Sequence, residues 1–332
     1  MNIHTTESES FARYWQMLLS EAENIAYYIQ PEAQRYYAAY FEINIQDARV
    51  VVELGGEPII GLAMTQHQKN GITYFGYAGL GAQLIVHRNA SDTARKGAYK
   101  ALIHHLESRL NENTPIRFEF HESVQNSLSP LALWLMKHQA ESLPYFQQTI
   151  HLNVPLSEIK TNIRKSYKGE IKKGETLLSH HMTDHDNFQK GCIQAMQQLH
   201  LDVAGKKTRS DESWDSQERQ IAAGEAFLIE GYLEEELVSA GLYLCSPTIC
   251  YYGVGVYQRE HFDKPLSHIQ VWLALQEAQK RGCRVFDFGE SFFAGQKKAD
   301  GAIPNEKELH IADFKRGFGG LFLPSLRLVF TR

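Results

Sequence analysis

Cysteine is scarce in this sequence, and its spacing excludes the common cysteine-based architectures. Only four of the 332 residues are cysteine (Cys192, Cys245, Cys250 and Cys283), and no two of them form a CxxC pair. A disulfide framework and a zinc ribbon are therefore not expected. Cys245 and Cys250 flank a Ser-Pro-Thr turn, so we expect them to face each other across a hairpin as two packed thiols, which a reducing cytoplasm favours.

Long hydrophobic runs and an excess of basic residues are missing as well. No apolar run approaches the roughly 20 residues of a membrane span, and the start, MNIHTTESESFARYW, lacks the basic and apolar regions of a signal peptide. We therefore expect a soluble, cytoplasmic protein. The net charge of −5 and the pI near 6.3 argue against a general nucleic-acid binder but allow a local basic groove.

The common nucleotide-binding and nucleophile motifs do not occur: no P-loop, no Rossmann fingerprint and no GxSxG sequence. A composition of 43% hydrophobic and 22% charged residues is nevertheless that of a globular protein with a substantial core. A length of 332 residues favours about two domains.

A repeated pattern divides the chain into two similar halves. Residues 117–123 (RFEFHES) and 285–291 (VFDFGES) share the order aromatic, acid, aromatic, any residue, Glu, Ser. An amphipathic helix is predicted before each, at Thr93–Leu110 and Ser267–Arg281, and each helix follows a two-strand hairpin pattern with a polar turn, at 55–57 and 234–236. We interpret residues 1–154 and 155–332 as two copies of one α/β unit, with mixed, mainly antiparallel sheets flanked by helices.

The block from Gly282 to Gly320 carries the residues most suited to chemistry. A short strand is predicted to bring the carboxylates of Asp287 and Glu290 to its end, and Lys315 precedes a glycine-rich turn. A carboxylate that removes a proton from an amine and an ammonium beside a carbonyl oxygen that gains charge suit acyl transfer to nitrogen. Either carboxylate is a candidate base; a capping or salt-bridging role is the alternative for each.

The order of helix, antiparallel strands, helix and acid-tipped strand resembles the GNAT acyltransferase unit. Two such units in tandem, with the blocks FDFG and FKRGFGG near the C-terminus, resemble the Fem-type (FemAB-like) family, which includes peptidoglycan-bridge aminoacyltransferases. The resemblance covers the architecture of the whole chain and particular residues within 155–173 and 238–320. It implies that Lys315 of the pair Phe314–Lys315 holds the aminoacyl donor and stabilises the reacting carbonyl.

Basic side chains recur every four residues where the second half begins: Lys160, Arg164, Lys168 and Lys172, with Lys165 and Lys173 beside them. This spacing predicts a positive stripe on one helix face, which Gly169 weakens or ends midway. A solvated helix face is one interpretation. The other is phosphate contact, as in the comparable basic segment of the Fem-type family, through Arg164, Lys165, Lys168 and also Arg316.

Two further groups of residues are candidates. The hairpin tyrosines Tyr243, Tyr251, Tyr252 and Tyr257 are interpreted mostly as core and sheet surface, with Tyr252 as a candidate substrate contact. The run SHHMTDHD at 179–186 is rich in His and Asp but fits no compact metal site, so we expect no metal. In the first half, Glu119, His121 and Glu122 correspond to the acidic block and are either vestigial or part of an acceptor pocket.

A missing loop bears on the acyl donor. GNAT enzymes that use acyl-CoA carry a glycine-containing loop at a helix start, where backbone N–H groups bind the pyrophosphate. The stretch REHFDKPLSHIQ before the second helix has no glycine, and Arg95-Lys96-Gly97-Ala98 has the wrong spacing. We therefore expect no tightly bound cofactor and an aminoacyl-tRNA donor, with acyl-CoA as the alternative co-substrate.

The expected function is an acyl- or aminoacyltransferase that acts on a primary amine of a cell-envelope precursor or small molecule. Two alternatives stay open: an acyl-CoA-dependent GNAT N-acyltransferase acting on an amino sugar or similar amine, and a non-catalytic ligand-binding protein of the same fold. Residues 188–223 predict only a short helical region, in place of the long coiled-coil arm of some bridge-forming family members.

Overall fold

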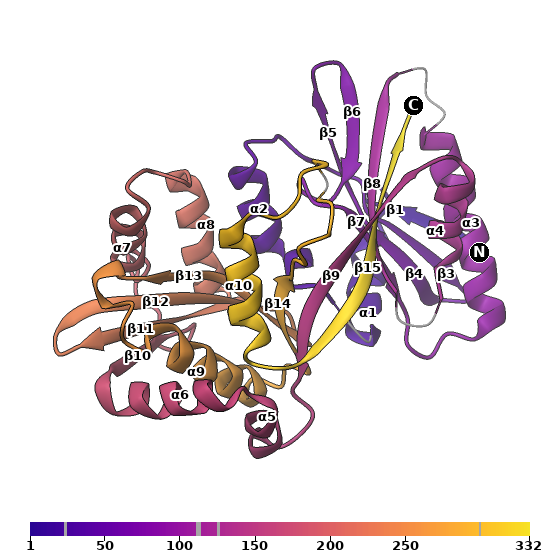
Figure 1. The fold of residues 1–332 in the computed structure, drawn as a ribbon. Helices are drawn as coiled ribbons and strands as arrows, with labels where there is room; N and C mark the ends of the chain where they lie inside the picture. The colour runs from indigo at the N-terminus through magenta and orange to yellow at the C-terminus, as the bar shows by residue number, and fades with distance from the viewer. Residues whose placement is uncertain (23–24, 111–113, 125–126, 299) are drawn as a thin grey trace.

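The computed structural model describes residues 1–22, 25–110, 114–124, 127–298 and 300–332. The described strands join into one mixed sheet with helices on both faces (Figure 1). The first half contains, in order, β1 (Asn2–Thr5), α1 (Phe11–Glu21), the 3₁₀ turn η1 (Tyr27–Ile29), α2 (Pro31–Tyr40), β2 (Gln46–Asp47), β3 (Val50–Leu54), β4 (Glu57–Ala63), β5 (Thr65–Lys69), β6 (Ile72–Gly76), β7 (Ala82–Val86), α3 (Asp92–Leu110), β8 (Ile116–Ser123), α4 (Pro130–Lys137) and β9 (Glu141–His151).

The second half repeats this plan with additional helices. It contains, in order, α5 (Leu156–Asn162), α6 (Lys165–Leu177), β10 (Ser179–Thr183), α7 (Gln194–Ala204), α8 (Asp211–Ala222), β11 (Ala226–Leu233), β12 (Glu236–Cys245), β13 (Ile249–Tyr257), the 3₁₀ turn η2 (Arg259–His261), α9 (Leu266–Lys280), β14 (Val285–Glu290), α10 (Glu306–Arg316) and β15 (Leu321–Thr331).

The predicted repeat is confirmed. In each half a helix joins two parallel strands, α3 between β7 and β8 and α9 between β13 and β14, whereas most other neighbouring strands are antiparallel. The two predicted helices agree with α3 and α9 to within one residue at each end. The predicted polar turns join β3 to β4 and β11 to β12.

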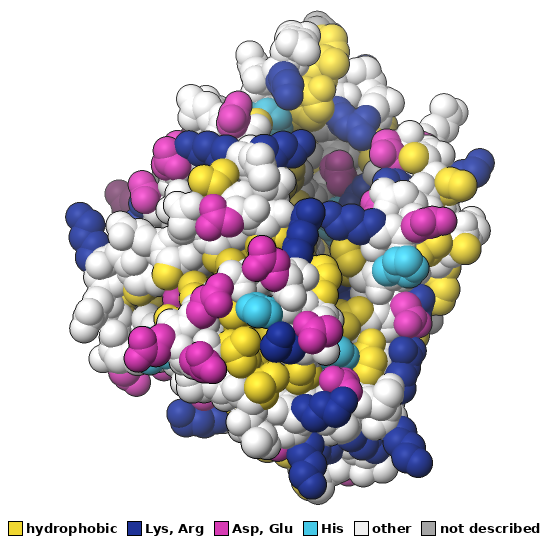
Figure 2. All heavy atoms as spheres, turned by 60° about the vertical axis from the view of Figure 1, so that its left-hand side comes forward, with side chains coloured by type: hydrophobic (Ala, Val, Ile, Leu, Met, Phe, Trp, Pro, Cys, Tyr) yellow, Lys and Arg dark blue, Asp and Glu magenta, His cyan; other side chains and the backbone are white. Residues whose placement is uncertain are grey.

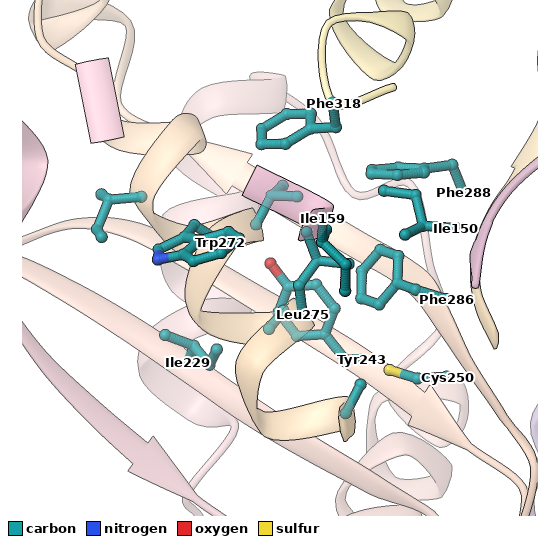
Figure 3. Close-up of a cluster of buried hydrophobic side chains, with 14 of the residues drawn as sticks. Ile150, Ile159, Ile229, Tyr243, Cys250, Trp272, Leu275, Phe286, Phe288 and Phe318 are labelled. Carbon is teal, nitrogen blue, oxygen red and sulfur yellow. The ribbon is translucent and has the colours of Figure 1, made fainter. Parts of the chain in front are cut away.

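The cores follow from the spacing of apolar residues. Along α3, alanines and leucines four residues apart are buried against the first half of the sheet, because positions four apart share one face of a helix. In the second half, Trp272 and Leu275 of α9 pack against Phe286 and Phe288 of β14 (Figure 3). Ile150 of β9 joins the same cluster, so the first half contributes to the core of the second.

The two halves exchange strands at the centre of the sheet. The strand order there is β8-β15-β9-β14, so β9 pairs on both edges with strands from the second half and β15 pairs with β8 of the first (Figure 1). At the N-terminus of α2, the backbone N–H groups of Glu32 and Ala33 donate to the Glu225 carboxylate of the second half. The boundary at residues 154 and 155 stays a prediction about sequence units; the sheet itself runs continuously through both halves.

The four cysteines are free thiols, and Cys245 lies opposite Cys250 in the register of β12 and β13, as predicted. Burial raises the pKa of the Cys250 thiol, so it stays protonated at neutral pH.

Candidate active site

β14 places a carboxylate on the sheet face opposite its aromatic core. Phe286 and Phe288 are fully buried, and Asp287 between them points the other way because side chains alternate along a strand. The N–H of Gly289 donates to Oδ1 of Asp287 at 2.7 Å. Gly289 has φ of 74°, and a Cβ there would lie 3.0 Å from the Tyr251 ring, so this turn requires glycine.

Lys315 reaches the same strand end from the last turn of α10. This helix begins with a capping box in which the side chains of Asn305 and Glu308 bond each other's backbone N–H groups. At the other end, Nζ of Lys315 donates to the carbonyl oxygen of Glu290 at 3.1 Å. Nε2 of the fully buried Gln148 donates to the carbonyl oxygens of Lys315 and Gly319, both at 2.7 Å, and so fixes the turn that carries the lysine.

The glycines after Lys315 allow the turn to pack closely. A Cβ on Gly317 would overlap the ring of Tyr167, and the carbonyl oxygen of Gly317 accepts the backbone N–H of Arg164 at 2.8 Å. Gly320 has φ of 93° and lies against the carbonyl oxygen of Thr149. The predicted glycine-rich turn thus serves to dock α10 onto α6 and β9.

Burial shifts the pKa values of both Asp287 and Lys315 toward neutral pH. Desolvation raises the pKa of Asp287 to about 6, although the Gly289 N–H and the Lys315 ammonium act in the opposite direction. Desolvation lowers the pKa of Lys315 to about 8, and the carboxylates of Asp287 and Glu290 partly offset this. Between about pH 6 and 8 the pair therefore consists of a carboxylate and an ammonium that are both close to exchanging a proton.

Glu290 lies at the open end of β14. Its Oε1 accepts from Nε2 of Gln296 at 3.2 Å. Burial raises its pKa, whereas Arg327 and Lys315 favour its charged form. Asp287, Glu290 and Lys315, which were predicted from sequence to act together, lie together at one end of β14.

The predicted binding residues occupy different places. Phe314 packs with Tyr167 and Phe318 against the core cluster, which lies on the sheet face opposite Asp287. Arg316 donates from Nη1 to the carbonyl oxygen of Phe292 at 3.2 Å, and its guanidinium lies 5.5 Å from the centre of the Phe293 ring.

The prediction that the basic residues share one helix face, with a weak point or an end at Gly169, is wrong. The helix ends at Asn162, and a second begins at Lys165, because Ile163 and Arg164 adopt extended backbone conformations that dock beside Gly317. Gly169, where a break was expected, lies within α6. The basic row is therefore divided between α5 and α6.

The members of the divided row differ in their contacts. Arg164 forms an ion pair with Asp313 at 3.2 Å, and Nζ of Lys168 donates to the carbonyl oxygen of Thr161 at 2.9 Å, while Lys165 is exposed. Lys172 and Lys173 line a cavity of about 610 Å³ that Lys264 also borders.

Tyr251, rather than Tyr252, shares the sheet face of Asp287. Tyr251 lies beside Asp287 in the parallel register of β13 and β14, and its ring stacks on Tyr27 at 4.1 Å. The Tyr252 hydroxyl instead bonds that of Tyr257 at 2.8 Å, within the aromatic core. The strand alternation of Phe286-Asp287-Phe288 was readable from the sequence, but the register that pairs Asp287 with Tyr251 was not.

Other residues of the same face were missed because they lie on the exchanged strands. Nε2 of Gln147 on β9 is 3.5 Å from Oδ2 of Asp287, and Oγ of Ser325 on β15 donates to Oε1 of Gln147 at 3.3 Å. In the first half, Glu119 and His121 point to this face. Glu122 points to the other face and accepts the N–H and hydroxyl of Ser129 at the start of α4, a capping role.

Figure 2 shows a hollow in one face of the molecule, with Lys and Arg side chains at its rim and an acidic side chain recessed within it.

Among the described residues, one group could hold a metal ion by its geometry: Asp184, His185 and Asp186. The two last are exposed, and Asp184 already forms an ion pair with Arg281 at 2.6 Å. No described helix is long and apolar enough to cross a membrane.

Comparison with known proteins shows that this chain shares its fold with proteins of known structure. No family model matches the chain, and no curated protein matches it in sequence. The crystal structure of FemX superposes over 98% of this chain and 97% of FemX, with a TM-score of 0.72 and 12% sequence identity. The chain has the FemAB-like, tandem GNAT fold.

Two further structures share this FemAB-like fold. The C-terminal domain (DUF2156) of a putative lysylphosphatidylglycerol synthetase from Agrobacterium fabrum matches 97% of this chain and 91% of its own, with a TM-score of 0.58 and 9% identity. A tandem GNAT protein from the clavulanic acid biosynthesis pathway matches 100% of this chain and 98% of its own, with a TM-score of 0.51 and 13% identity. Within this fold, residues 188–223 form α7 and α8, which pack on the sheet through Met196, Leu199 and Trp214.

The contact that fixes the Lys315 turn can be tested separately. Replacing Gln148 by leucine removes its hydrogen bonds to the carbonyl oxygens of Lys315 and Gly319, of which that of Lys315 still accepts the N–H of Phe318, so we expect the free energy of unfolding to fall by about 1–3 kcal/mol. We also expect any activity that depends on Lys315 to fall in the folded protein. Gln279 is a matched control, because its Nε2 also donates to two carbonyl oxygens, those of Leu152 and Val154.

Denaturant unfolding and activity assays of both variants make the comparison. Gln279→Leu should lower stability to a similar degree without lowering the activity of the folded protein. Equal activities of the two variants would show that Gln148 contributes only to stability.

Proposed function

We propose that the protein is an N-acyl- or aminoacyltransferase that joins an activated acyl group to a primary amine. The observation that carries the proposal is the pair Asp287 and Lys315, a carboxyl group with a pKa of about 6 and an ammonium with a pKa of about 8 at one strand end. These values suit a base for an ammonium substrate and a cation for an oxyanion near neutral pH.

The proposed reaction uses each group once. Asp287, or Glu290 at the open end, takes a proton from the acceptor ammonium, and the free amine attacks the carbonyl carbon of the donor ester or thioester. The negative charge on the carbonyl oxygen is stabilised by the Lys315 ammonium. The carbon–oxygen or carbon–sulfur bond then breaks, the leaving group takes up one proton, and the new amide has lost two protons from nitrogen, so one proton is released overall.

Aminoacyl-tRNA is the donor that we favour. α9 begins after Pro265 without a side-chain cap or a glycine loop, so its start lacks the cradle that a pyrophosphate uses. β13 and β14 pair over only three residues, and the aromatic cluster beside their diverging ends includes Tyr252, Phe288 and Phe318. Phosphate groups of the donor are assigned to Lys165 and Arg316, with Arg164 and Lys168 beside them. The acceptor is an amine of a cell-envelope precursor or a small molecule in the cytoplasm.

Acyl-CoA is the alternative donor, because the tandem GNAT protein of the clavulanic acid pathway, a structure described as being without AcCoA, shares the whole fold. The non-catalytic ligand-binding protein is the remaining alternative.

A donor comparison with the purified protein tests the proposal. A mixture of aminoacylated tRNAs and a set of acetyl- and longer acyl-CoAs are each assayed for binding and for slow hydrolysis of the donor. We expect hydrolysis of charged tRNA that is lost in Lys315→Ala and retained in Lys307→Ala, which removes an exposed lysine of the same helix. Hydrolysis of acyl-CoA alone would instead establish the acyl-CoA enzyme, and inertness toward both donors would support the binding protein.

A further inference from the structure

A second polar cluster lies on the sheet face of Asp287, about two strands away from it. Arg327 of β15 faces His121 of β8 in the antiparallel register. Nε of Arg327 is 3.2 Å from Oε1 of Glu119 and 3.4 Å from Nε2 of His121, and the same Glu119 oxygen lies 3.3 Å from His121. Tyr145 of β9 completes the cluster, with its ring 5.9 Å from the Arg327 guanidinium and 5.7 Å from the His121 ring.

The terminal nitrogens of Arg327 are not used by this cluster. Glu119 and His121 both contact Nε, and within the described part of the chain neither Nη1 nor Nη2 makes a hydrogen bond. The Arg327 side chain is 26% exposed to solvent, so a ligand can approach these nitrogens from solution. A guanidinium held at Nε, with both terminal N–H groups free, matches the two oxygens of a carboxylate or phosphate.

A row of polar side chains links this guanidinium to Asp287. Arg327 lies over Tyr145, and Tyr145 is opposite Ser325 in the register of β9 and β15. Ser325 bonds Gln147, and Gln147 lies 3.5 Å from Asp287. Arg327 is also close enough to Glu290 to favour the charged form of that carboxyl group. A molecule lying along this row has one end at Arg327 and the other at the carboxylates.

We infer that Arg327 binds an anionic group, a carboxylate or a phosphate, of the acceptor and thereby orients its amine toward Asp287 and Glu290. The inference rests on the proposed function and narrows the acceptor to an amine that carries an anionic group. Glu119 and His121 hold the guanidinium in place, and Tyr145 supports its face. The selectivity for such acceptors comes from the positive charge of Arg327 together with the paired geometry of its two terminal nitrogens.

Matched pairs of amines test this inference. Glycylglycine is compared with glycylglycinamide, and phosphoethanolamine with ethanolamine, as acceptors of the acyl group from the donor that the comparison proposed above selects. We expect the anionic member of at least one pair to have the lower KM, and the two pairs show whether a carboxylate or a phosphate is preferred. Equal KM values within both pairs in the unaltered enzyme would overturn the inference.

The variant Arg327→Lys keeps the positive charge beside Glu119 but removes the paired terminal nitrogens of the guanidinium. Because the variant loses paired hydrogen bonds to a charged group, we expect KM for the anionic acceptor to rise by about tenfold or more. The KM for its neutral partner and the rate of slow donor hydrolysis should stay unchanged. Arg117→Lys is the matched control, because Arg117 lies on the same strand and face as Glu119 but opposite Thr331, farther along β15.

The readouts separate this inference from the proposed function. Loss of donor hydrolysis in Lys315→Ala tests the chemistry, whereas Arg327→Lys tests only the choice of acceptor. An equal rise in KM for charged and neutral acceptors, or an equal effect of Arg117→Lys, would show a structural role for Arg327 and overturn its assignment. Thermal unfolding of each variant confirms that it is folded under the assay conditions.

Discussion

Replacing Lys315 by alanine is expected to lower the rate of acyl transfer by about 10²–10³-fold. The ammonium is half-buried at the strand end and bonds the Glu290 carbonyl oxygen. In the proposed reaction it stabilises the oxygen that becomes negative in the transition state. Because this charge develops during the reaction, the loss should fall on kcat more than on KM. Steady-state kinetics with a saturating donor measure the effect.

Two further variants define the role of Lys315. Lys315→Arg keeps the charge but changes its size and hydrogen-bond geometry, so we expect only partial activity. Lys307→Ala should have the activity of the unaltered protein, because Lys307 is exposed on α10. A fully active Lys315→Ala enzyme would remove Lys315 from the mechanism.

Replacing Asp287 by asparagine is expected to lower kcat/KM by about 10²–10⁴-fold while making the protein more stable. The loss of activity is the result expected where Asp287, and not Glu290, is the base of the proposed reaction. In the unaltered enzyme, kcat/KM should rise with pH through about 6 as Asp287 loses its proton, and fall through about 8 as Lys315 loses its proton. The variant should lack the rise near pH 6. In the variant, kcat/KM should begin to decrease at a pH below 8, because the Asp287 carboxylate, which raises the pKa of Lys315, is no longer present.

The gain in stability follows from the same burial. The pKa of Asp287 is raised in the folded protein from 3.8 to about 6, so the stability that its protonated form contributes is present below about pH 4 and is lost as pH rises through about 6. Asparagine stays neutral at every pH. The variant should therefore gain about 1–3 kcal/mol over the unaltered protein as the pH increases from 4 to 7.

Urea unfolding at pH 4 and pH 7.5 measures this difference. Asp263→Asn serves as the control, because its side chain is 75% exposed and its replacement should change stability little at either pH. A stability gain that is the same at both pH values would show that ionisation of Asp287 does not cause it.

The sequence predicted the repeated units well because their signals are local. The apolar spacing of α3 and α9, the turns at 55–57 and 234–236 and the aromatic-acid alternation of β14 each depend on residues near one another in the chain. The same local reading placed Asp287, Glu290 and Lys315 together, because the strand and the glycine-rich turn both occur in the last quarter of the sequence.

The remaining residues of the site depend on contacts between distant segments. Gln147, Tyr145 and Arg327 reach the site through β9 and β15, whose pairing no local pattern reveals. Tyr252 was chosen over Tyr251 because a tyrosine's orientation depends on the register between β13 and β14. The break in the basic helix was expected at Gly169 and not at Ile163 and Arg164, because the actual break comes from docking against Gly317, about 150 residues later in the chain.

The exchange of β9 and β15 has a consequence for how the molecule unfolds. A chain cut between residues 154 and 155 leaves the first part with β9 but neither of its two neighbours, and leaves the second part with β14 lacking one partner. Ile150 would also be removed from the core around Phe286. Neither part thus contains the interior that it needs, and calorimetry should find a single cooperative transition in which the duplicated halves melt together. Two halves that repeat one pattern in the sequence are thus expected to behave as one thermodynamic unit.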